Sequence, residues 1–454
     1  MKRSGIWIVK MKPVFKPTVL SVVVFFCAPI PGVALTGGGV LDNPAGSISR
    51  QVERNAERLV ERAANRRIDN RLKKQTDSLK GSLKTLPEVL PVYTATGHKA
   101  FNDVALKDGF RAVERQWLVT GTAEEIEGLD RPGITVLERT TLSGLGMMVA
   151  RFRVRADMDS LETLRTLLPG LADRLDRNHV YSPQISQSQY PGEAEASPGE
   201  SLCEGPVRIG MIDTSVATEH PAFQDARIME QRFLSTEGGR GDLAPVTEHG
   251  TAVAGQMVGR RGEPGKARLP AATLFNASVF YRRTKDLSGA TLGHLLEGLD
   301  WLATQKLPVI NISLTGPDNL LLAAAVRKLR EQGTLLVAAV GNEGPAAPPL
   351  YPAAYPEVVG VTAASRTGDL FRWANRGEQV MFAAHGVAVD VPHPDGGVIT
   401  DSGTSLAAPV VTAALACGVS GGDSEAALAA LIDQAQDLGE PGRDSLFGFG
   451  FLPY

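Results

Sequence analysis

The sequence predicts an α/β protein whose C-terminal half forms a parallel sheet covered by helices, preceded by a smaller α/β unit. Beyond residue 201, short apolar segments typical of buried strands alternate with segments of helical periodicity. Such alternation favours a parallel sheet whose connections are helices. Before that point, residues 113–183 follow the order strand, helix, strand, strand, helix, strand. This second pattern is typical of a ferredoxin-like unit.

The N-terminus has the features of a secretory signal peptide. Basic residues precede the apolar run Thr18–Ala28, and small residues follow it up to Ala34. The run is shorter than the roughly 20 residues that a membrane helix needs. We therefore expect a signal over residues 1–34, no stable membrane span after its removal, and a secreted or periplasmic protein. Either Met1 or Met11 is the start.

Residues 35–112 are predicted to form a charged helical spacer. Arginine recurs every four residues from Arg50 to Arg66, and a thin apolar stripe runs beside it at Val52, Ala56, Leu59 and Ala63. The pattern favours a solvated or weakly coiled-coil helix over a membrane or nucleic-acid role. A net charge of -3 also argues against nucleic-acid binding. The role of this helix stays open.

The ferredoxin-like unit is followed by a linker. The predicted strands of the ferredoxin-like unit are 116–120, 134–140, 147–154 and a last stretch up to Tyr181, and its predicted helices are 123–129 and 159–168. No catalytic group of residues stands out in it. Residues 184–202 contain a segment rich in proline, glycine, glutamate and serine, which is typical of a linker.

The C-terminal part, residues 203–454, carries the strands of the predicted parallel sheet. They are Val207–Ile212, Thr273–Phe280, Val309–Ser313, Thr334–Val340 and Val358–Ala363. The segments Leu292–Ala303 and Leu320–Glu331 have helical periodicity. Functional groups of such sheets gather at the carboxyl ends of the strands.

Three polar residues occupy positions of this kind: Asp213, His249 and Ser405. Asp213 ends an apolar strand, His249 begins a run of glycine and small residues, and Ser405 lies four residues before Pro409 at the start of an alanine-rich helix. Each has an ordinary structural explanation, since Asp and Ser are common helix caps. Together they offer a hydroxyl, an imidazole that can take its proton, and a carboxylate that can fix the tautomer of the imidazole.

The segments around these residues resemble the motifs of the subtilisin-like serine peptidases, the subtilases. They are GMIDTSV, EHGTAVAG and GTSLAAP, with LVAAVGNEGP between the second and the third. The resemblance covers residues 203–454 and implies that family's sheet with helices on both faces. It also implies that Ser405 is the nucleophile, His249 the base and then the acid, and Asp213 the residue that orients His249. The oxyanion hole would use the side-chain amide of Asn342 and the Ser405 N–H.

The same resemblance implies a substrate cleft between two strands. One would contain Leu287, Ser288 and Gly289, and the other Ser313, Leu314, Thr315 and Gly316. A substrate backbone would be held between them as an added strand. The family often has glycine at the position of Thr315, so a branched side chain there should narrow the pocket for the residue before the cut.

Residues 113–183 resemble the propeptide domain of the family, which inhibits the enzyme until it is cut away. The resemblance therefore implies a zymogen that is cut between about Tyr181 and Ser201, with its own propeptide as an intramolecular inhibitor. Protein or peptide substrates are the other expected partners, and the mature protein is expected to be a monomer. Two alternatives remain: a maturation peptidase of narrow specificity, favoured by Thr315, and a non-catalytic subtilase-like binding protein, suggested by Ser215, Thr315 and His385.

An esterase of the α/β-hydrolase type does not fit this sequence. That class places its nucleophile in an early G-x-S-x-G turn, with the order Ser, acid, His, whereas the order here is Asp213, His249, Ser405. No cofactor or metal is expected, since the loop after His249 lacks an acid and amide cluster. Removal of the signal leaves Cys203 and Cys417, which either form a disulfide or are separate buried thiols.

Overall fold

The computed structural model describes residues 86–183, 200–236, 241–261, 265–419 and 422–454. The predicted signal peptide, most of the predicted helical spacer and residues 184–199 of the linker lie outside these ranges.

The C-terminal part is built on an eight-stranded sheet in which every neighbouring pair is parallel. This confirms the predicted fold class. In spatial order the strands are β19 (Phe451–Leu452), β16 (Phe382–His385), β15 (Val358–Ala364), β14 (Leu335–Ala339), β12 (Val309–Ile312), β7 (Arg208–Asp213), β9 (Thr273–Ser278) and β8 (Arg227–Arg232).

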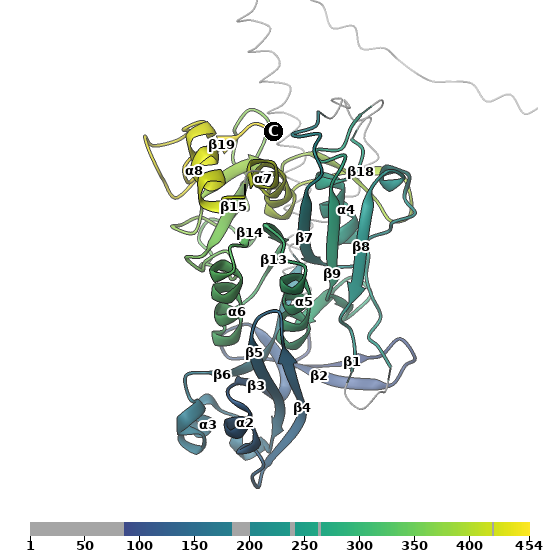
Figure 1. Cartoon of the computed structure of the whole chain (residues 1–454). Helices are drawn as coiled ribbons and strands as arrows, with labels where there is room; N and C mark the ends of the chain where they lie inside the picture. The colour runs from purple at the N-terminus through teal and green to yellow at the C-terminus, as the bar shows by residue number, and fades with distance from the viewer. Residues whose placement is uncertain (1–85, 184–199, 237–240, 262–264, 420–421) are drawn as a thin grey trace, which may run out of the picture. The chain divides into compact units, whose positions relative to one another are not determined.

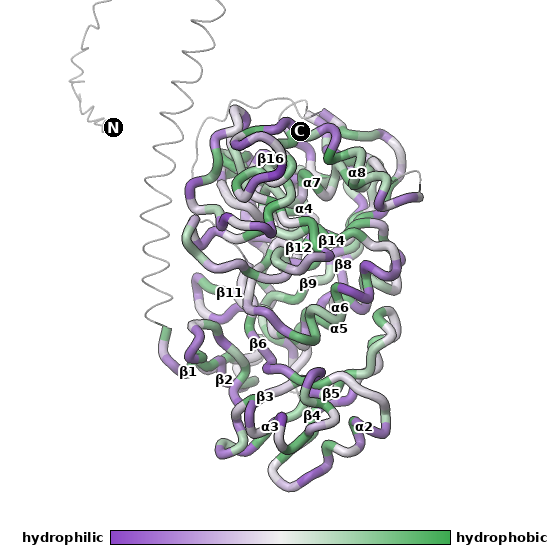
Figure 2. Tube along the Cα trace, turned by 90° about the vertical axis from the view of Figure 1, so that its left-hand side faces the viewer, coloured by the Kyte–Doolittle hydropathy of each residue, from purple (hydrophilic) through white to green (hydrophobic). Residues whose placement is uncertain are grey.

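Helices cover both faces of this sheet (Figure 1). Side chains alternate between the faces of a strand, and in β14 residues Leu335 and Val337 pack with α4 (Glu248–Met257) and α7 (Thr404–Gly418). Leu336 and Ala338 belong instead to the core with α5 (Leu292–Thr304) and α6 (Leu320–Glu331), and α8 (Ser424–Gln434) packs on α7. Figure 2 shows the resulting hydrophobic interior along α4, α7, β12 and β14. Both cores therefore hold the ends of the central strands in place.

The predicted ferredoxin-like order is present in the N-terminal unit. Its elements are β3 (Arg111–Thr120), α2 (Ala123–Glu127), β4 (Ile134–Leu142), β5 (Met147–Val154), α3 (Leu161–Leu167) and β6 (Leu175–Pro183). The strands pair antiparallel in the order β4, β5, β3, β6, around a small core that includes Trp117 and Phe152. Thr122 caps α2 in a capping box with Glu125, which explains why so short a helix begins there.

A β-hairpin lies where the sequence predicted the end of the helical spacer. Its strands are β1 (Val89–Tyr93) and β2 (Lys99–Ala105), and β2 pairs antiparallel with β3. The turn between the strands uses Gly97 at a φ of 84°, a conformation that favours glycine. The prediction of a helical spacer over 35–112 is thus wrong for residues 89–105. The hairpin was hard to recognise in the sequence because Pro91 interrupts the short apolar run and because the strand that pairs with β2 lies further along the chain.

Strand β6 continues the sheet of the N-terminal unit into the C-terminal part. It pairs antiparallel with β11 (Ser288–Thr291) and with β13 (Leu314–Thr315). The short β10 (Tyr281–Arg282) pairs with β11, and β17 (Val389–Pro392) forms a separate ribbon with β18 (Val398–Asp401). The two parts therefore share one continuous sheet through β6.

The two cysteines form a disulfide in the structure. Cys203 precedes the first strand of the parallel sheet and Cys417 lies in the last turn of α7. The bond closes a sequence separation of 214 residues. Of the two alternatives that the sequence left open, the structure has the disulfide.

Candidate active site

Asp213 and His249 are joined at the carboxyl edge of the parallel sheet. Asp213 is the last residue of β7 and is fully buried, and its Oδ1 lies 2.7 Å from Nδ1 of His249 in the first turn of α4. The Thr214 backbone N–H also donates to this oxygen at 2.6 Å. Because a carboxylate can only accept, Nδ1 carries the hydrogen, and Nε2 is left as the basic nitrogen of the ring.

The glycine after His249 allows this approach. The backbone N–H of Gly250 donates to the Thr214 hydroxyl at 2.7 Å, so the start of α4 is bonded to the loop that follows β7. A Cβ at Gly250 would lie 2.5 Å from the carbonyl oxygen of Thr214. The residue after the histidine must therefore be glycine for the imidazole to reach Asp213.

Ser405 lies in the first turn of α7 and is almost fully buried. Four residues later in this helix comes Pro409, which has no N–H to donate to the Ser405 carbonyl. The hydroxyl of Ser313 donates to that carbonyl instead, at 3.1 Å, and itself accepts from the Asn311 amide at 2.9 Å. Ser313 thus supplies the hydrogen bond that Pro409 cannot make to the Ser405 carbonyl, and this bond fixes the beginning of α7 to the end of β12.

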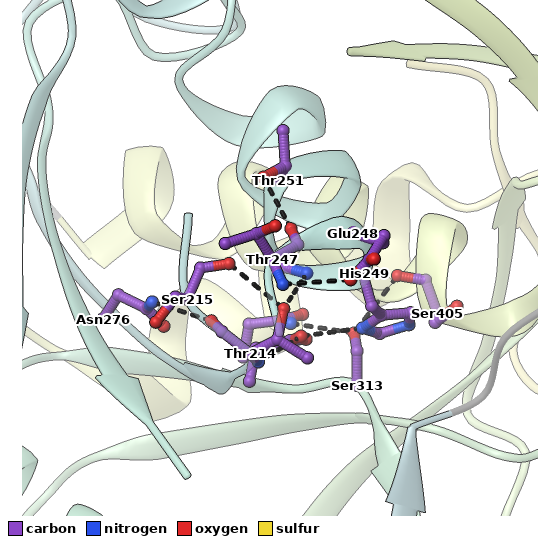
Figure 3. A network of polar contacts seen from close by, with 12 residues as sticks. Thr214, Ser215, Thr247, Glu248, His249, Thr251, Asn276, Ser313 and Ser405 are labelled. Atoms are coloured by element: carbon purple, nitrogen blue, oxygen red, sulfur yellow. Dashed lines mark hydrogen bonds and ion pairs between the residues drawn. The ribbon is translucent and has the colours of Figure 1, made fainter. Parts of the chain in front are cut away.

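The close view places these residues together: Figure 3 shows the side chain of His249 beside Ser405, with Ser313 next to them. The three residues that the sequence singled out come from β7, α4 and α7, and the fold brings them to one edge of the sheet.

Asn342 follows β14 and is held against the start of α7. Its Oδ1 accepts hydrogen bonds from the backbone N–H and the hydroxyl of Thr404, both at 3.0 Å. The amide oxygen therefore faces Thr404, and the amide nitrogen is turned to the opposite side. The preceding Gly341 has a φ of 108°, which only glycine adopts easily, and its N–H donates to the Thr404 hydroxyl at 3.2 Å.

Strand β13 contains Leu314 and Thr315, two of the residues predicted to line one side of the substrate cleft. Leu314 pairs with Pro183 and Thr315 with Ser182, so β6 runs antiparallel along it. Gly316 lies against the ring of Tyr181, and a Cβ there would come within 2.3 Å of that ring. Of the predicted residues of this wall, Ser313 contacts α7, whereas the other three lie along β6.

The residues predicted for the opposite side of the cleft lie at the start of β11, and their part in substrate binding stays a prediction. Ala290 and Thr291 pair with β6, whereas Ser288 and Gly289 pair with β10 and Leu287 immediately precedes the strand. Gly289 still touches β6, since a Cβ there would lie 2.9 Å from Val180. Ala290 and Thr291, which the sequence analysis did not single out, make the pairing with β6, and Thr291 also caps α5.

The residues that depart from the family motifs have local structural roles. The hydroxyl of Ser215, just after β7, is hydrogen-bonded to that of Ser278 at the end of β9 at 2.8 Å. His385 bonds the Val387 carbonyl through Nε2, and burial, followed by the nearby Arg366, lowers the pKa of its imidazole to about 3. These contacts explain how the Ser215 and His385 side chains are accommodated, and neither contact involves Asp213 or His249.

Comparison with known proteins agrees with this geometry. An Asp–His pair beside a serine is the arrangement of serine hydrolases, and here it stands at the carboxyl edge of a parallel sheet. The model of the subtilase family matches residues 205–450, more than half of the 454 residues. The chain therefore belongs to the subtilase family of subtilisin-like serine peptidases.

Several characterised relatives are similar to this chain. The minor extracellular protease Epr of Bacillus subtilis is 34% identical over 51% of this chain and 37% of its own length. The major intracellular serine protease of the same species is 31% identical over 46% of this chain and 67% of its own length. Subtilisin DY of Bacillus licheniformis is also 31% identical, over 46% of this chain and 75% of its own length. The matched region thus spans little more than a third of Epr.

One solved structure extends the likeness of fold beyond residues 203–454, which we call the peptidase part. It is a serine-to-alanine mutant of the epidermin leader peptide processing serine protease EpiP from Staphylococcus aureus, with a TM-score of 0.59. The match covers 74% of this chain and 97% of that one at 16% sequence identity. At this identity the likeness concerns the fold alone.

Metal-binding clusters and membrane helices are not found in the described part of the chain. Within those ranges, no group of three or more His, Cys, Asp or Glu side chains is arranged to hold a metal ion. Among the helices described there, none combines the length and the apolar character needed to cross a bilayer.

Proposed function

We propose that the protein is a serine endopeptidase that cleaves peptide bonds through an acyl-enzyme on Ser405. The observation that carries this proposal is the 2.7 Å contact between the fully buried Asp213 and Nδ1 of His249, with Ser405 beside the ring. In this arrangement Nε2 of His249 takes the proton of the serine hydroxyl as the oxygen attacks the scissile carbonyl. The imidazolium then gives the proton to the leaving amine, and a water repeats the sequence to release the acid.

Asn342 is proposed to stabilise the oxyanion of both tetrahedral intermediates. Its amide oxygen is held by Thr404, so the Nδ2 donor is oriented before any substrate binds. The backbone N–H of Ser405 in the first turn of α7 would be the second donor, and the start of a helix favours negative charge.

We further propose that residues 113–183 are an inhibitory propeptide and that the protein is exported as a zymogen. The support is the position of β6, which lies between β11 and β13 in the manner of a bound extended substrate. The chain that follows Pro183 would then pass the active site, and the processing cut would fall in residues 184–202. The signal-like N-terminus is consistent with secretion into an extracellular or periplasmic space.

A narrow-specificity maturation peptidase is the second candidate. It is favoured by Thr315, a buried branched residue at the wall of the cleft where β6 pairs. Cleavage of a diverse peptide library by the mature protein separates the two candidates, because broad cutting excludes the narrow one.

Labelling with a fluorophosphonate probe tests the enzyme proposal. We expect the mature wild-type protein to be labelled and Ser405→Ala to remain both unlabelled and full length. Ser402→Ala is the matched control, because the Ser402 hydroxyl accepts a hydrogen bond from the Ala388 N–H and has no proposed part in the chemistry. Folded mature protein that takes no label would favour the non-catalytic binding protein instead.

A further inference from the structure

The β1–β2 hairpin, which precedes the ferredoxin-like unit, is docked on the peptidase part. Thr94 forms an antiparallel bridge with Leu243, and the Ala95 N–H donates to the Asp242 carbonyl at 2.9 Å. Behind this edge, Val92 of the hairpin shares a small apolar core with residues of the peptidase part: Leu234, Leu243 and Tyr281. The hairpin therefore has its own contact with the peptidase part, outside the cleft strands.

Phe101 and Tyr281 meet across the same boundary. Their rings are perpendicular, with centroids 5.6 Å apart, a favourable geometry for two aromatic side chains. Tyr281 is fully buried, and burial raises the pKa of its phenol above the usual range, so the hydroxyl stays protonated beside the hairpin.

A buried ion pair joins the hairpin to the peptidase part beside this core. Asp103 on β2 has no exposed surface, and its carboxylate lies 2.5 Å from the guanidinium of Arg283, which is also almost fully buried. The second oxygen of Asp103 accepts from Nε of Arg111 on β3 at 2.6 Å. One carboxylate thus compensates two cations, and one of these belongs to the other side of the boundary.

Arg283 also lies against the wall of the cleft. Its side chain crosses Gly289 of β11, where a Cβ would come within 2.5 Å of the Arg283 Cδ and 2.9 Å of Val180 on β6. The Arg283 backbone N–H is fixed by the Leu287 carbonyl at 2.8 Å. The ion pair is therefore adjacent to the place where β6 joins the cleft.

We propose that the hairpin is a second inhibitory contact, and that the Asp103–Arg283 ion pair sets how long the cut propeptide stays on the enzyme. This inference rests on the proposed zymogen. In the docked state Arg283 is out of water, so it needs the carboxylate of Asp103, because a buried charge that loses its partner is strongly destabilising. In the released enzyme water can solvate the guanidinium. Loss of Asp103 removes its contact with Arg111 in both states, but it leaves Arg283 buried without its carboxylate only in the docked state.

The test uses the full chain and follows two quantities after self-cleavage. One is the amount of cut N-terminal fragment that still elutes with the peptidase part on size exclusion, and the other is the rise of activity on a fluorogenic peptide. We expect Asp103→Asn to be cut normally and to release the fragment about 10²-fold faster. Its final kcat/KM should equal that of the wild type, because the altered residue leaves with the fragment.

Glu88→Gln is the matched control. Glu88 lies next to β1 on the same hairpin and is exposed, so the substitution changes the charge of the fragment equally without touching the ion pair. We expect its release rate to stay within about twofold of the wild type.

Arg283→Gln supplies the second variant, should Asp103→Asn fail to fold. It should also speed release. The double variant should speed release by less than the product of the two single effects, because Asp103 and Arg283 share one interaction. Wild-type release rates in both single variants would overturn the inference and leave the peptidase proposal intact. If the wild type itself neither cuts nor hydrolyses peptide, the proposed function fails first, and the inference with it.

Discussion

The peptidase part and the β1–β2 hairpin each contain a fully buried aspartate, but the two carboxylates are held in different ways. Asp213 and His249 stand on a strand end and a helix start that belong to one core, and their hydrogen bond forms when that core folds. Asp103 and Arg283 come from two surfaces that must meet. Damage to the first pair should therefore change the chemistry, whereas damage to the second should change only the lifetime of a complex.

The largest expected effect comes from Asp213→Asn. An asparagine side chain can donate to Nδ1 and so favours the wrong tautomer of His249, which leaves no base for Ser405. We expect kcat/KM and the rate of self-cleavage to fall by about 10⁴-fold, with the fold and melting temperature little changed. Peptide hydrolysis and the mass of the purified protein measure both effects.

Asp390→Asn is the control for that variant. Asp390 lies in β17 and accepts from the Thr400 hydroxyl at 2.8 Å, so it is another partly buried aspartate of the peptidase part. We expect it to retain activity within a few fold. Substantial hydrolysis by Asp213→Asn would show that the buried pair is structural and would remove the main support for the enzyme proposal.

The second effect concerns the cleft and is smaller. Tyr181 is fully buried, its ring covers Gly316, and its hydroxyl donates to the Pro317 carbonyl at 3.2 Å. Tyr181→Ala removes the whole ring and leaves a cavity at this contact, which should weaken the docking of β6 by about 3–5 kcal/mol. Tyr181→Phe removes only the hydrogen bond, worth about 1 kcal/mol. We expect release of the cut fragment to accelerate strongly in the first variant and slightly in the second.

Tyr93→Ala provides the contrast for this prediction. Tyr93 also lies on a strand of the N-terminal region, but its side chain is half exposed. Its truncation should leave the release rate unchanged. Equal release rates for Tyr181→Ala and the wild type would mean that the cleft contributes little to the hold on β6.

The difference between contacts within one core and contacts between distant segments also explains which features the sequence could predict. Asp213, His249, Asn342 and Ser405 lie in contiguous motifs, and the fold brings the first, second and fourth together at the carboxyl edge where such groups were expected. The motifs alone did not reveal why Ser313 matters, because its role depends on the N–H that Pro409 lacks.

Contacts between distant segments were beyond prediction. The hairpin at residues 89–105 was missed because a strand is stabilised by its partner, and nothing near β2 indicates that β3 and Arg283 will receive it. The disulfide was undecidable for the same reason, as spacing carries no information over 214 residues. That Ala290 and Thr291 are the residues of β11 that pair with β6 is a matter of register, which depends on the position of β6.

The smallest effect is a pH dependence confined to the contact between the two parts. Glu297 on α5 is partly buried, and burial, with the nearby Glu138 of β4 second, raises the pKa of its carboxyl to about 7, while Arg151 opposes the shift. A raised pKa means that the protonated form is favoured in the docked state. The contribution of Glu297 to docking is therefore fully present below its ordinary pKa of 4.5 and is lost as the pH rises through about 7.

The cut fragment should consequently stay bound longer at pH 5 than at pH 8. Because the carboxyl keeps some contact with water, we expect a difference of about tenfold or less in the release rate. Glu297→Gln should abolish this difference, whereas Glu331→Gln, at an exposed ion pair with Lys328, should keep it. Release is measured by size exclusion at each pH, so that the pH dependence of hydrolysis does not enter. A difference in release rate larger than tenfold that persists in Glu297→Gln would show that the titrating group is another residue of the contact and does not lie on α5.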